Sequence, residues 1–304
     1  MEISVIIPVY NKAPYLADCL ESVLEQEFNS FEAVAVDDGS TDESGTILDR
    51  FARKYPALRV IHTDNHGVTA ARRTAVEASQ GRYITFVDAD DTLRPHALAT
   101  LHEAITREDA DEVVATSYNI RKGEHVNNAL VGYADPQWMI GQLLGWKAKF
   151  CVLWAVIFKR ELLDGCLNAP REVNAGEDVL MQILCLLKNP KVYFINDSVY
   201  NYNAGLPNDR RFTLQRAIAT DNVLRKALSI SDVGGGKYAD LFTLQQIKIY
   251  ECFIADGQLD VLDRYYRPVR KRLTRAIPLL DRIAICLPPW LARWPIRWWK
   301  RRQR

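Results

Sequence analysis

The chain has 304 residues, and its 39 lysines and arginines nearly balance 38 aspartates and glutamates, for a formal net charge of +1. With 48% hydrophobic and 25% charged residues, the composition is that of a globular protein, which excludes a disordered or fibrous chain. The charge is nevertheless divided, because residues 264–304 carry thirteen basic residues and one acid, whereas residues 1–263 carry 26 basic and 37 acidic residues. An acidic body with a basic tail points to a membrane or a nucleic acid as a partner.

Residues 1–118 alternate between strand and helix patterns. The apolar run at 3–9 predicts a strand buried on both faces, and the helix after it has Pro14 in its first turn. Residues 40–43, with the sequence STDE, have the spacing of a capping box and predict the start of a second helix. The other elements expected here are strands at 33–36, 58–62, 83–87 and 112–116 and helices at 68–79 and from about 95 onward. Strands separated by single helices predict an α/β fold with a largely parallel sheet.

The pattern is looser after residue 118. Residues 121–128 are polar and predict a loop, and the region from 206 onward is mostly helical in pattern. Between them we expect helices at 138–144 and 178–187 and buried strands at 151–158 and 192–195. No basic region opens the chain, its longest apolar run has nine residues, and its six cysteines form no C-x-x-C pair. These features predict a cytoplasmic protein with reduced thiols and without a membrane-spanning helix.

Two of the predicted strands run into clusters of carboxylates, Asp37-Asp38 and Asp88-Ala89-Asp90-Asp91. Ligands of an open parallel sheet bind beyond the carboxyl ends of its strands, and although aspartate is also a common turn residue, two clusters at one sheet edge favour a bound cation. The D-x-D pattern suits Mg²⁺, which takes few protein carboxylates and can stabilise a departing diphosphate. The chain has neither a P-loop nor a G-x-G-x-x-G motif, which excludes a P-loop nucleotidase and argues against a dinucleotide dehydrogenase.

Four motifs occur in one order and spacing: VIIPVYN, DDGSTD, N-x-G-x-x-x-A-R at 65–72, and GRYITFVDADD. Together they resemble the family 2 glycosyltransferases, densely over about the first 100 residues and more thinly through 152–163, 176–187 and 199–203. The resemblance implies a GT-A fold, a Rossmann-like and mostly parallel sheet flanked by helices, with a helical C-terminal extension. We expect residues 1–118 to form the donor-binding half, 119–205 the acceptor-binding and catalytic half, and 206–304 the extension.

The resemblance also implies a nucleotide site. Pro8 and Tyr10 would line the base and ribose pocket, and Asp38 would accept the imide N–H of uracil, so that the expected donor is a UDP-sugar. Arg72 matches the family arginine near the nucleotide. Arg73 and Ala75 depart from the pattern, since many relatives carry Asn and Gly there, which affects the local loop packing and the contacts to the donor sugar.

The DADD motif would complete the donor site. By the same resemblance, Asp88 and Ala89 contact the ribose or the donor sugar, and Asp90 binds the divalent cation, Mg²⁺ or Mn²⁺, directly. Glu177-Asp178 is the other chemical motif. Acids favour the first turn of a helix for electrostatic reasons alone, but in this family the pair carries the catalytic base. Asp178 matches that base. Glu177 would position the acceptor or a loop.

The tail combines basic residues with tryptophans that recur every four residues, Trp290, Trp294 and Trp298. On a helix they form one stripe surrounded by cations, a composition that suits an anionic membrane surface. A helix that packs its tryptophans on the body and a solvated end are alternative interpretations. No nucleic-acid-binding motif supports a nucleic-acid partner.

The resemblance therefore implies a metal-dependent, inverting glycosyltransferase. It would move a sugar from a nucleotide donor to a hydroxyl of a glycan or lipid-linked acceptor in bacterial surface polysaccharide or lipopolysaccharide synthesis, and lie peripherally on the inner face of the membrane. Two alternatives differ in class. A sugar-nucleotide pyrophosphorylase should have a glycine-rich loop after the first strand, where PVYNKAPY stands, and a non-catalytic sugar-nucleotide-binding protein would lack one of Asp38, Asp90 and Asp178.

Overall fold

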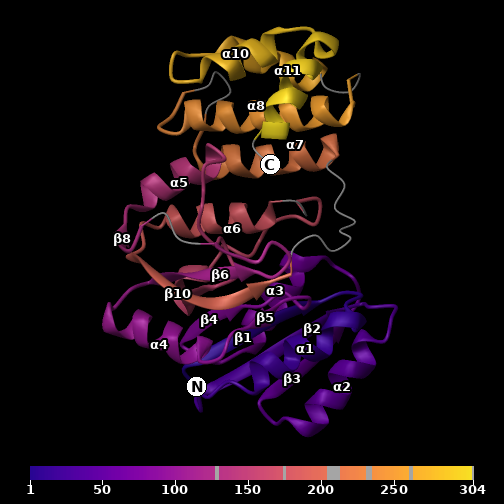
Figure 1. Cartoon of the computed structure of the whole chain (residues 1–304), viewed down its shortest axis with the longest axis vertical. Coiled ribbons are helices and arrows are strands. Elements are labelled where there is room, and N and C mark those ends of the chain that lie inside the picture. The colour runs from indigo at the N-terminus through magenta and orange to yellow at the C-terminus, as the bar shows by residue number, and fades with distance from the viewer. Residues whose placement is uncertain (127–129, 174–175, 204–212, 231–234, 260–262, 303–304) are drawn as a thin grey trace. The chain divides into compact units, whose positions relative to one another are not determined.

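The computed structural model describes residues 1–126, 130–173, 176–203, 213–230, 235–259 and 263–302 (Figure 1). The chain divides into two compact units, one of residues 1–139 and 149–209 and the other of residues 140–148 and 210–304. Residues 1–118 and 119–205, expected as two halves of one domain, share the sheet of the first unit, except that residues 140–148 belong to the second. Each unit has its own core.

The N-terminal half of the sheet is parallel. The strands β3 (Leu58–Thr63), β2 (Phe31–Asp38), β1 (Ile3–Val9) and β4 (Tyr83–Phe86) lie side by side in that order. Every residue of β1 except Pro8 is buried, as the unbroken apolar run predicts. The helices between these strands are α1 (Ala13–Leu24), α2 (Ser44–Lys54) and α3 (Val68–Ala78), of which α3 packs on β1 and β2.

The other half of the sheet is mixed. Beyond β4 the order is β9 (Val156–Lys159), β6 (Glu112–Asn119), β10 (Val192–Tyr202) and β5 (Thr92–Leu93). The β6–β10 pair is parallel, whereas β9 runs antiparallel to both β4 and β6. The short strands β7 (Glu124–Val126) and β8 (Gly132–Ala134) pair with β6 and β10, and the helices of this half are α4 (Ala97–Arg107), η1 (Arg160–Leu163) and α6 (Glu177–Leu186).

Two local predictions were wrong, and a third was too short. The segment 151–158 becomes a strand only at Val156, because Ala155 has a φ of +58° and Trp154 makes only an isolated bridge to Phe86. Its apolar character reflects burial rather than an extended backbone. The predicted loop at 121–128 contains β7, and the strand predicted at 192–195 continues to Tyr202.

The capping box at residues 40–43 was also misplaced, because α2 begins four residues later, at Ser44. Asp42 of this box and the adjoining Ser44 cap α1 instead. Asp42 Oδ2 accepts the Ala13 N–H at 3.0 Å, and Ser44 Oγ accepts the Lys12 N–H at 2.8 Å. These bonds satisfy amide donors that the start of α1 leaves open, and they tie the loop after β2 to the loop after β1.

The second unit is helical, as expected of the C-terminal region. It contains α7 (Leu214–Ala227), α8 (Ala239–Asp256), α9 (Asp263–Tyr266), η2 (Arg267–Arg272), α10 (Leu279–Cys286) and α11 (Pro289–Arg302), and α5 (Pro136–Leu144) ends within it. Its core gathers around α8, which contributes Ile247, Tyr250 and Phe253, and α11 adds Ala292 and Ile296. Among the described helices, none is long and apolar enough to cross a membrane.

Candidate active site

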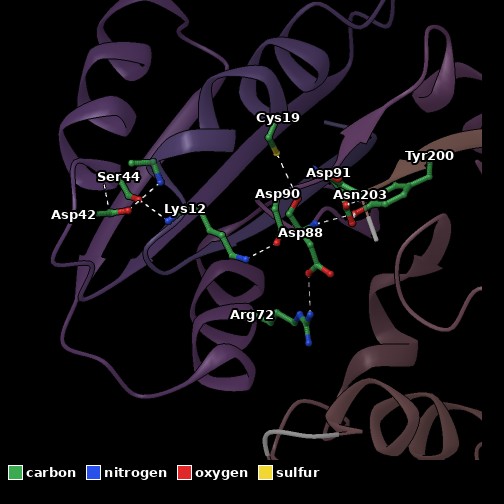
Figure 2. Close-up of polar contacts among 11 residues, drawn as sticks. Lys12, Cys19, Asp42, Ser44, Arg72, Asp88, Asp90, Asp91, Tyr200 and Asn203 are labelled. Atoms are coloured by element: carbon green, nitrogen blue, oxygen red, sulfur yellow. Dashed lines mark hydrogen bonds and ion pairs between the residues drawn. The ribbon is translucent and has the colours of Figure 1, made fainter. Parts of the chain in front are cut away.

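The DADD motif forms a turn directly after β4, closed by an Asp91 N–H to Asp88 carbonyl bond of 2.9 Å (Figure 2). The motif alternates in exposure. Asp88 and Asp90 are partly accessible, whereas Ala89 and Asp91 are buried. The turn therefore presents two carboxylates outward and uses the other two residues to hold itself in place.

Asp91 and the end of β10 fix this turn. The Tyr200 hydroxyl donates to Asp91 Oδ2 at 2.8 Å and accepts the Asp88 N–H at 3.1 Å, and the Asn203 N–H donates to Asp91 Oδ1 at 2.7 Å. Burial raises the pKa of Asp91 to about 7. Tyr200 is fully buried. Because its hydroxyl bonds to both Asp88 and Asp91, it fixes both ends of the DADD turn. Figure 2 shows Tyr200 and Asn203 meeting Asp91.

Two cations meet the exposed carboxylates. The Lys12 ammonium pairs with Asp90 Oδ2, and Arg72 Nη2 lies 3.1 Å from Asp88 Oδ1. Arg72 Nη1 lies 3.7 Å from Glu177 Oε1, and both Arg72 and Glu177 are almost completely buried. Arg72 thus joins the β4 turn to the first turn of α6. Its buried Nε has no hydrogen-bond partner among the described residues, which leaves one donor for a ligand.

The Glu177-Asp178 pair divides into a buried and an exposed member. Glu177 faces Arg72 in the interior, whereas Asp178 is half-buried and its Oδ1 accepts the Val179 N–H at 2.8 Å. Gly176 precedes the helix with a φ of +83°, a conformation that favours glycine. The arrangement leaves Asp178 as the accessible carboxylate of the pair and gives Glu177 an internal ionic partner.

Asp38 organises the loop before α3. It is buried, and its two oxygens accept the His66 and Gly67 N–H groups at 2.7 and 2.8 Å. Each carboxylate oxygen can accept a second hydrogen bond, so these contacts do not prevent it from accepting an imide N–H. Gly39, at a φ of +72°, is required beside it, since a Cβ there would lie 2.8 Å from the Asn65 nitrogen. The two loops therefore approach each other closely.

The remaining predicted residues lie at the end of β1 or on α3. Pro8 is half-buried in β1, and Tyr10, just beyond that strand, is 47% exposed and accessible for stacking. Of the two departures from the family pattern, Ala75 is buried, and Arg73 donates to Asn168 Oδ1 at 3.3 Å.

Trp154 belongs to an aromatic stack. Its ring lies 5.0 Å from that of Tyr202 at an interplanar angle of 6°, and 5.4 Å from that of Tyr200 at 25°. Because Tyr200 also fixes the DADD turn, the stack supports that turn. Trp154 is half-buried, which leaves part of its surface accessible.

The carboxylate oxygens of the DADD turn fit a divalent cation. The exposed carboxylates of Asp88 and Asp90 are hard oxygen ligands, and the Lys12 ammonium already pairs with Asp90. Among the described residues, no three His, Cys, Asp or Glu side chains converge as a complete cage. A cation held here would therefore share its coordination between Asp90 and the diphosphate of a ligand.

Sequence reasoning missed Lys12, Asp91 and Asn203. Lys12 could have been found as a cation placed directly after the first strand, at the same sheet edge as the aspartates. The role of Asn203 has no sequence signal, because it acts through its backbone N–H.

Residues 4–167 match the sequence profile of glycosyl transferase family 2. The chain is 31% identical over 242 residues to glycosyltransferase GlyG of Streptococcus pneumoniae. The aligned region covers 76% of this chain and 80% of GlyG. It is 27% identical over 207 residues to the poly(ribitol-phosphate) beta-N-acetylglucosaminyltransferase TarS of Staphylococcus aureus. This second aligned region covers 66% of this chain but only 35% of TarS.

Solved structures share the fold. TarS 1–349 in complex with UDP-GlcNAc matches with a TM-score of 0.76 over 100% of this chain and 93% of that one, at 18% identity. The mannosyltransferase PcManGT of Pyrobaculum calidifontis, solved with GDP-Man and Mn²⁺, matches with a TM-score of 0.55 at 17% identity, over 98% of this chain and 87% of its own. The fold is thus that of the GT-A glycosyltransferases. The chain belongs to glycosyl transferase family 2, and both expectations are confirmed.

Proposed function

We propose that this protein is a metal-dependent, inverting glycosyltransferase that moves a sugar from a UDP donor to a hydroxyl group. The observation that carries the proposal is the ionic chain through Arg72, which places the Asp88 carboxylate and the first turn of α6 around one buried guanidinium. A donor turn and a candidate base thereby share one site.

The donor half would use residues from the loops after β1, β2 and β4. Tyr10 and Pro8 would contact the base and ribose, Asp38 the uracil imide, and Asp88 and Ala89 the ribose or donor sugar. The free Nε–H of the buried Arg72 favours an anionic group nearby. A UDP donor is supported by the solved complex of TarS with UDP-GlcNAc.

Asp90 would hold Mg²⁺ or Mn²⁺ together with the diphosphate, and the cation would stabilise negative charge on the leaving group. Lys12, which pairs with Asp90, would then be released toward the diphosphate. Mn²⁺ in the solved complex of PcManGT supports the choice of ion.

Asp178 would act as the general base. It would take the proton of the acceptor hydroxyl as that oxygen attacks the anomeric carbon, and UDP would leave from the opposite face, which inverts the configuration. Glu177, held against Arg72, would position the helix that carries the base. Residues 1–118 would then serve as the donor half and residues 119–205 as the acceptor half.

The acceptor would be a glycan or a lipid-linked sugar of the bacterial surface. TarS is named for its action on poly(ribitol-phosphate), and a poly(ribitol-phosphate) beta-glucosyltransferase of Bacillus spizizenii is also 30% identical over 66% of this chain. The chain spans 32% of that relative and 35% of TarS. Surface polysaccharide or lipopolysaccharide synthesis at the cytoplasmic face of the membrane would fit the basic, tryptophan-rich tail.

The family match favours transfer over a pyrophosphorylase or a non-catalytic binding protein. The proposal is tested by UDP release across common UDP-sugars, with Mn²⁺ and with lipid-linked and lipopolysaccharide acceptors present. We expect release from at least one UDP-sugar, its loss in Asp90→Ala, and its retention in Asp18→Ala, which removes an exposed carboxylate of α1. Turnover that is equal with and without metal would contradict the proposed role of Asp90.

A further inference from the structure

Exposed apolar side chains gather on the last two helices. Thirteen large hydrophobic residues are exposed in the described part of the chain, and seven of them fall within residues 279–298. These seven, between 43% and 80% exposed, are Leu279, Leu280, Ile283, Trp290, Leu291, Trp294 and Trp298. We call them, with the arginines between them, the α10–α11 face. Such a concentration marks an interaction site rather than ordinary surface.

The helix α11 is held by its other side. Ala292 and Ile296 are buried in the core of the second unit, and α11 packs on α8. Trp290, Trp294 and Trp298 recur every four residues and so form one stripe, roughly opposite the buried pair. The helix is therefore already anchored without its tryptophans. This geometry disfavours the alternative in which these rings pack on the body of the protein.

The charge of this face has one sign. The same segment carries Arg282 and Arg293, which are half-buried, and Arg297, which is exposed although its Nε also donates to the Ala255 carbonyl at 2.9 Å. Asp281 is the single acid of residues 279–298, and it is buried and paired with the Lys248 ammonium. No exposed carboxylate within the segment offsets its arginines.

An apolar hollow of about 80 Å³ adjoins the face between α8, α10 and α11. Leu280 and Ile283 belong both to its lining and to the exposed set, and Leu287, Pro295 and Ile296 continue the apolar wall. Its polar residues are Lys248, Glu251 and Asp281, and the Lys248 ammonium pairs with both carboxylates. An apolar chain could fill this hollow.

We propose that the α10–α11 face docks on the surface of an anionic lipid bilayer, with both helices in the interface. Indole rings favour the headgroup boundary, aliphatic side chains enter the acyl region, and arginines bind lipid phosphates. This inference deepens the proposed location of the enzyme. It replaces a basic tail by a two-helix surface in which α10 supplies the aliphatic residues and α11 the tryptophans.

The same features disfavour other partners. A nucleic acid would require a cationic surface without so many exposed aliphatic residues. Pairing with a second copy would bring like-charged arginines together across the apolar contact. An anionic membrane complements both the apolar and the cationic components.

The test uses the full chain, because deleting residues 288–304 would also remove Ala292 and Ile296 from the core. Co-sedimentation with vesicles of phosphatidylcholine alone, and with 30% phosphatidylglycerol, is measured for the wild type and for Trp290→Ser combined with Trp294→Ser. The matched control, Ile120→Ser with Val131→Ser, removes two exposed apolar residues outside the face. We expect at least tenfold stronger binding to the anionic vesicles, at least a tenfold loss in the tryptophan variant, and no loss in the control.

Equal vesicle binding by the tryptophan variant and the wild type would overturn the proposal. So would a wild-type dimer in solution that the tryptophan variant converts to a monomer without vesicle binding, since the face would then join two copies. UDP release measured on the same samples separates this proposal from the enzymatic one. A protein that binds vesicles but releases no UDP contradicts only the transferase proposal, and one that releases UDP but binds no vesicles contradicts only the docking.

Discussion

Arg72 is the residue on which the geometry of the site depends. It is almost completely buried between Asp88 and Glu177, and those carboxylates come from the turn after β4 and from α6, which are far apart in the sequence. Its position was predicted from the family motif, but its partners could not be, because they are set by how α6 packs. The role of Asp91 was missed for a similar reason, because its carboxylate bonds to Tyr200 and Asn203, which lie more than a hundred residues further along the chain.

Replacing Arg72 by alanine should destabilise the protein strongly. Removing one partner of a buried ion pair typically costs about 3–5 kcal/mol, because the remaining charge is left buried without compensation. We expect a loss of this size in the free energy of unfolding, measured by urea denaturation. Arg73→Ala, which changes the neighbouring exposed arginine, should cost less than about 1 kcal/mol. Similar losses of unfolding free energy in both variants would show that the ion pairs of Arg72 do not stabilise the protein.

Tyr200→Phe should loosen the DADD turn while the ring remains stacked on Trp154. The hydroxyl makes two of the bonds that fix this turn, and a buried hydrogen bond contributes about 1 kcal/mol. We expect the affinity for UDP with Mn²⁺, measured by calorimetry, to fall by about fivefold to tenfold, and the KM for the donor to rise more than kcat falls. Unchanged UDP affinity would mean that the hydroxyl only stabilises the fold.

Among the elements, some patterns in the sequence predicted the observed helices and strands, and others did not. The parallel strands and helices of residues 1–118 were predicted because their apolar periods agree with the burial they later have. The segment 151–158 was not, because an apolar run reports burial but not backbone conformation. The capping box at 40–43 failed because its Asp42 accepts an amide N–H at the start of α1, a partner that local spacing cannot reveal.

The contact between β6 and α6 should make stability depend on pH. Glu112 is fully buried and accepts a bond from Gln182 at 2.5 Å, and burial raises its pKa to about 8. The folded protein thus keeps a proton that the unfolded chain loses above its usual pKa, so this stabilising contribution is present at low pH and is lost as pH rises toward 8.

Glu112→Gln removes that titration. We expect the variant to gain stability relative to the wild type as pH rises from 5 to 8, by at most about 1.4 kcal/mol per pH unit. Urea denaturation of both proteins at three pH values measures this difference. A constant difference across the range would contradict the raised pKa.

At the scale of the whole molecule, the residues of the candidate active site lie in the first unit, and the α10–α11 face lies in the second, helical unit. The uneven charge of the sequence anticipated this, since the basic residues gather at the C-terminus. Sequence alone left the orientation of the tryptophans open, because a stripe of period four fits both a buried and an exposed face. The fold decides this point, since Ala292 and Ile296 occupy the core and leave the tryptophans outside. It also adds α10, whose aliphatic residues were not part of the predicted tail.

In the proposed mechanism, Asp178 deprotonates the acceptor beside a donor site that forms independently of it. The most direct measurement compares UDP affinity and sugar transfer in Asp178→Asn and in the wild type, with Mn²⁺ and the donor identified by the screen. General-base catalysis contributes about 10²–10⁴-fold, so transfer should fall by at least a hundredfold while the Kd for UDP stays within about twofold. Transfer near the wild-type rate would exclude Asp178 as the base and place the base elsewhere.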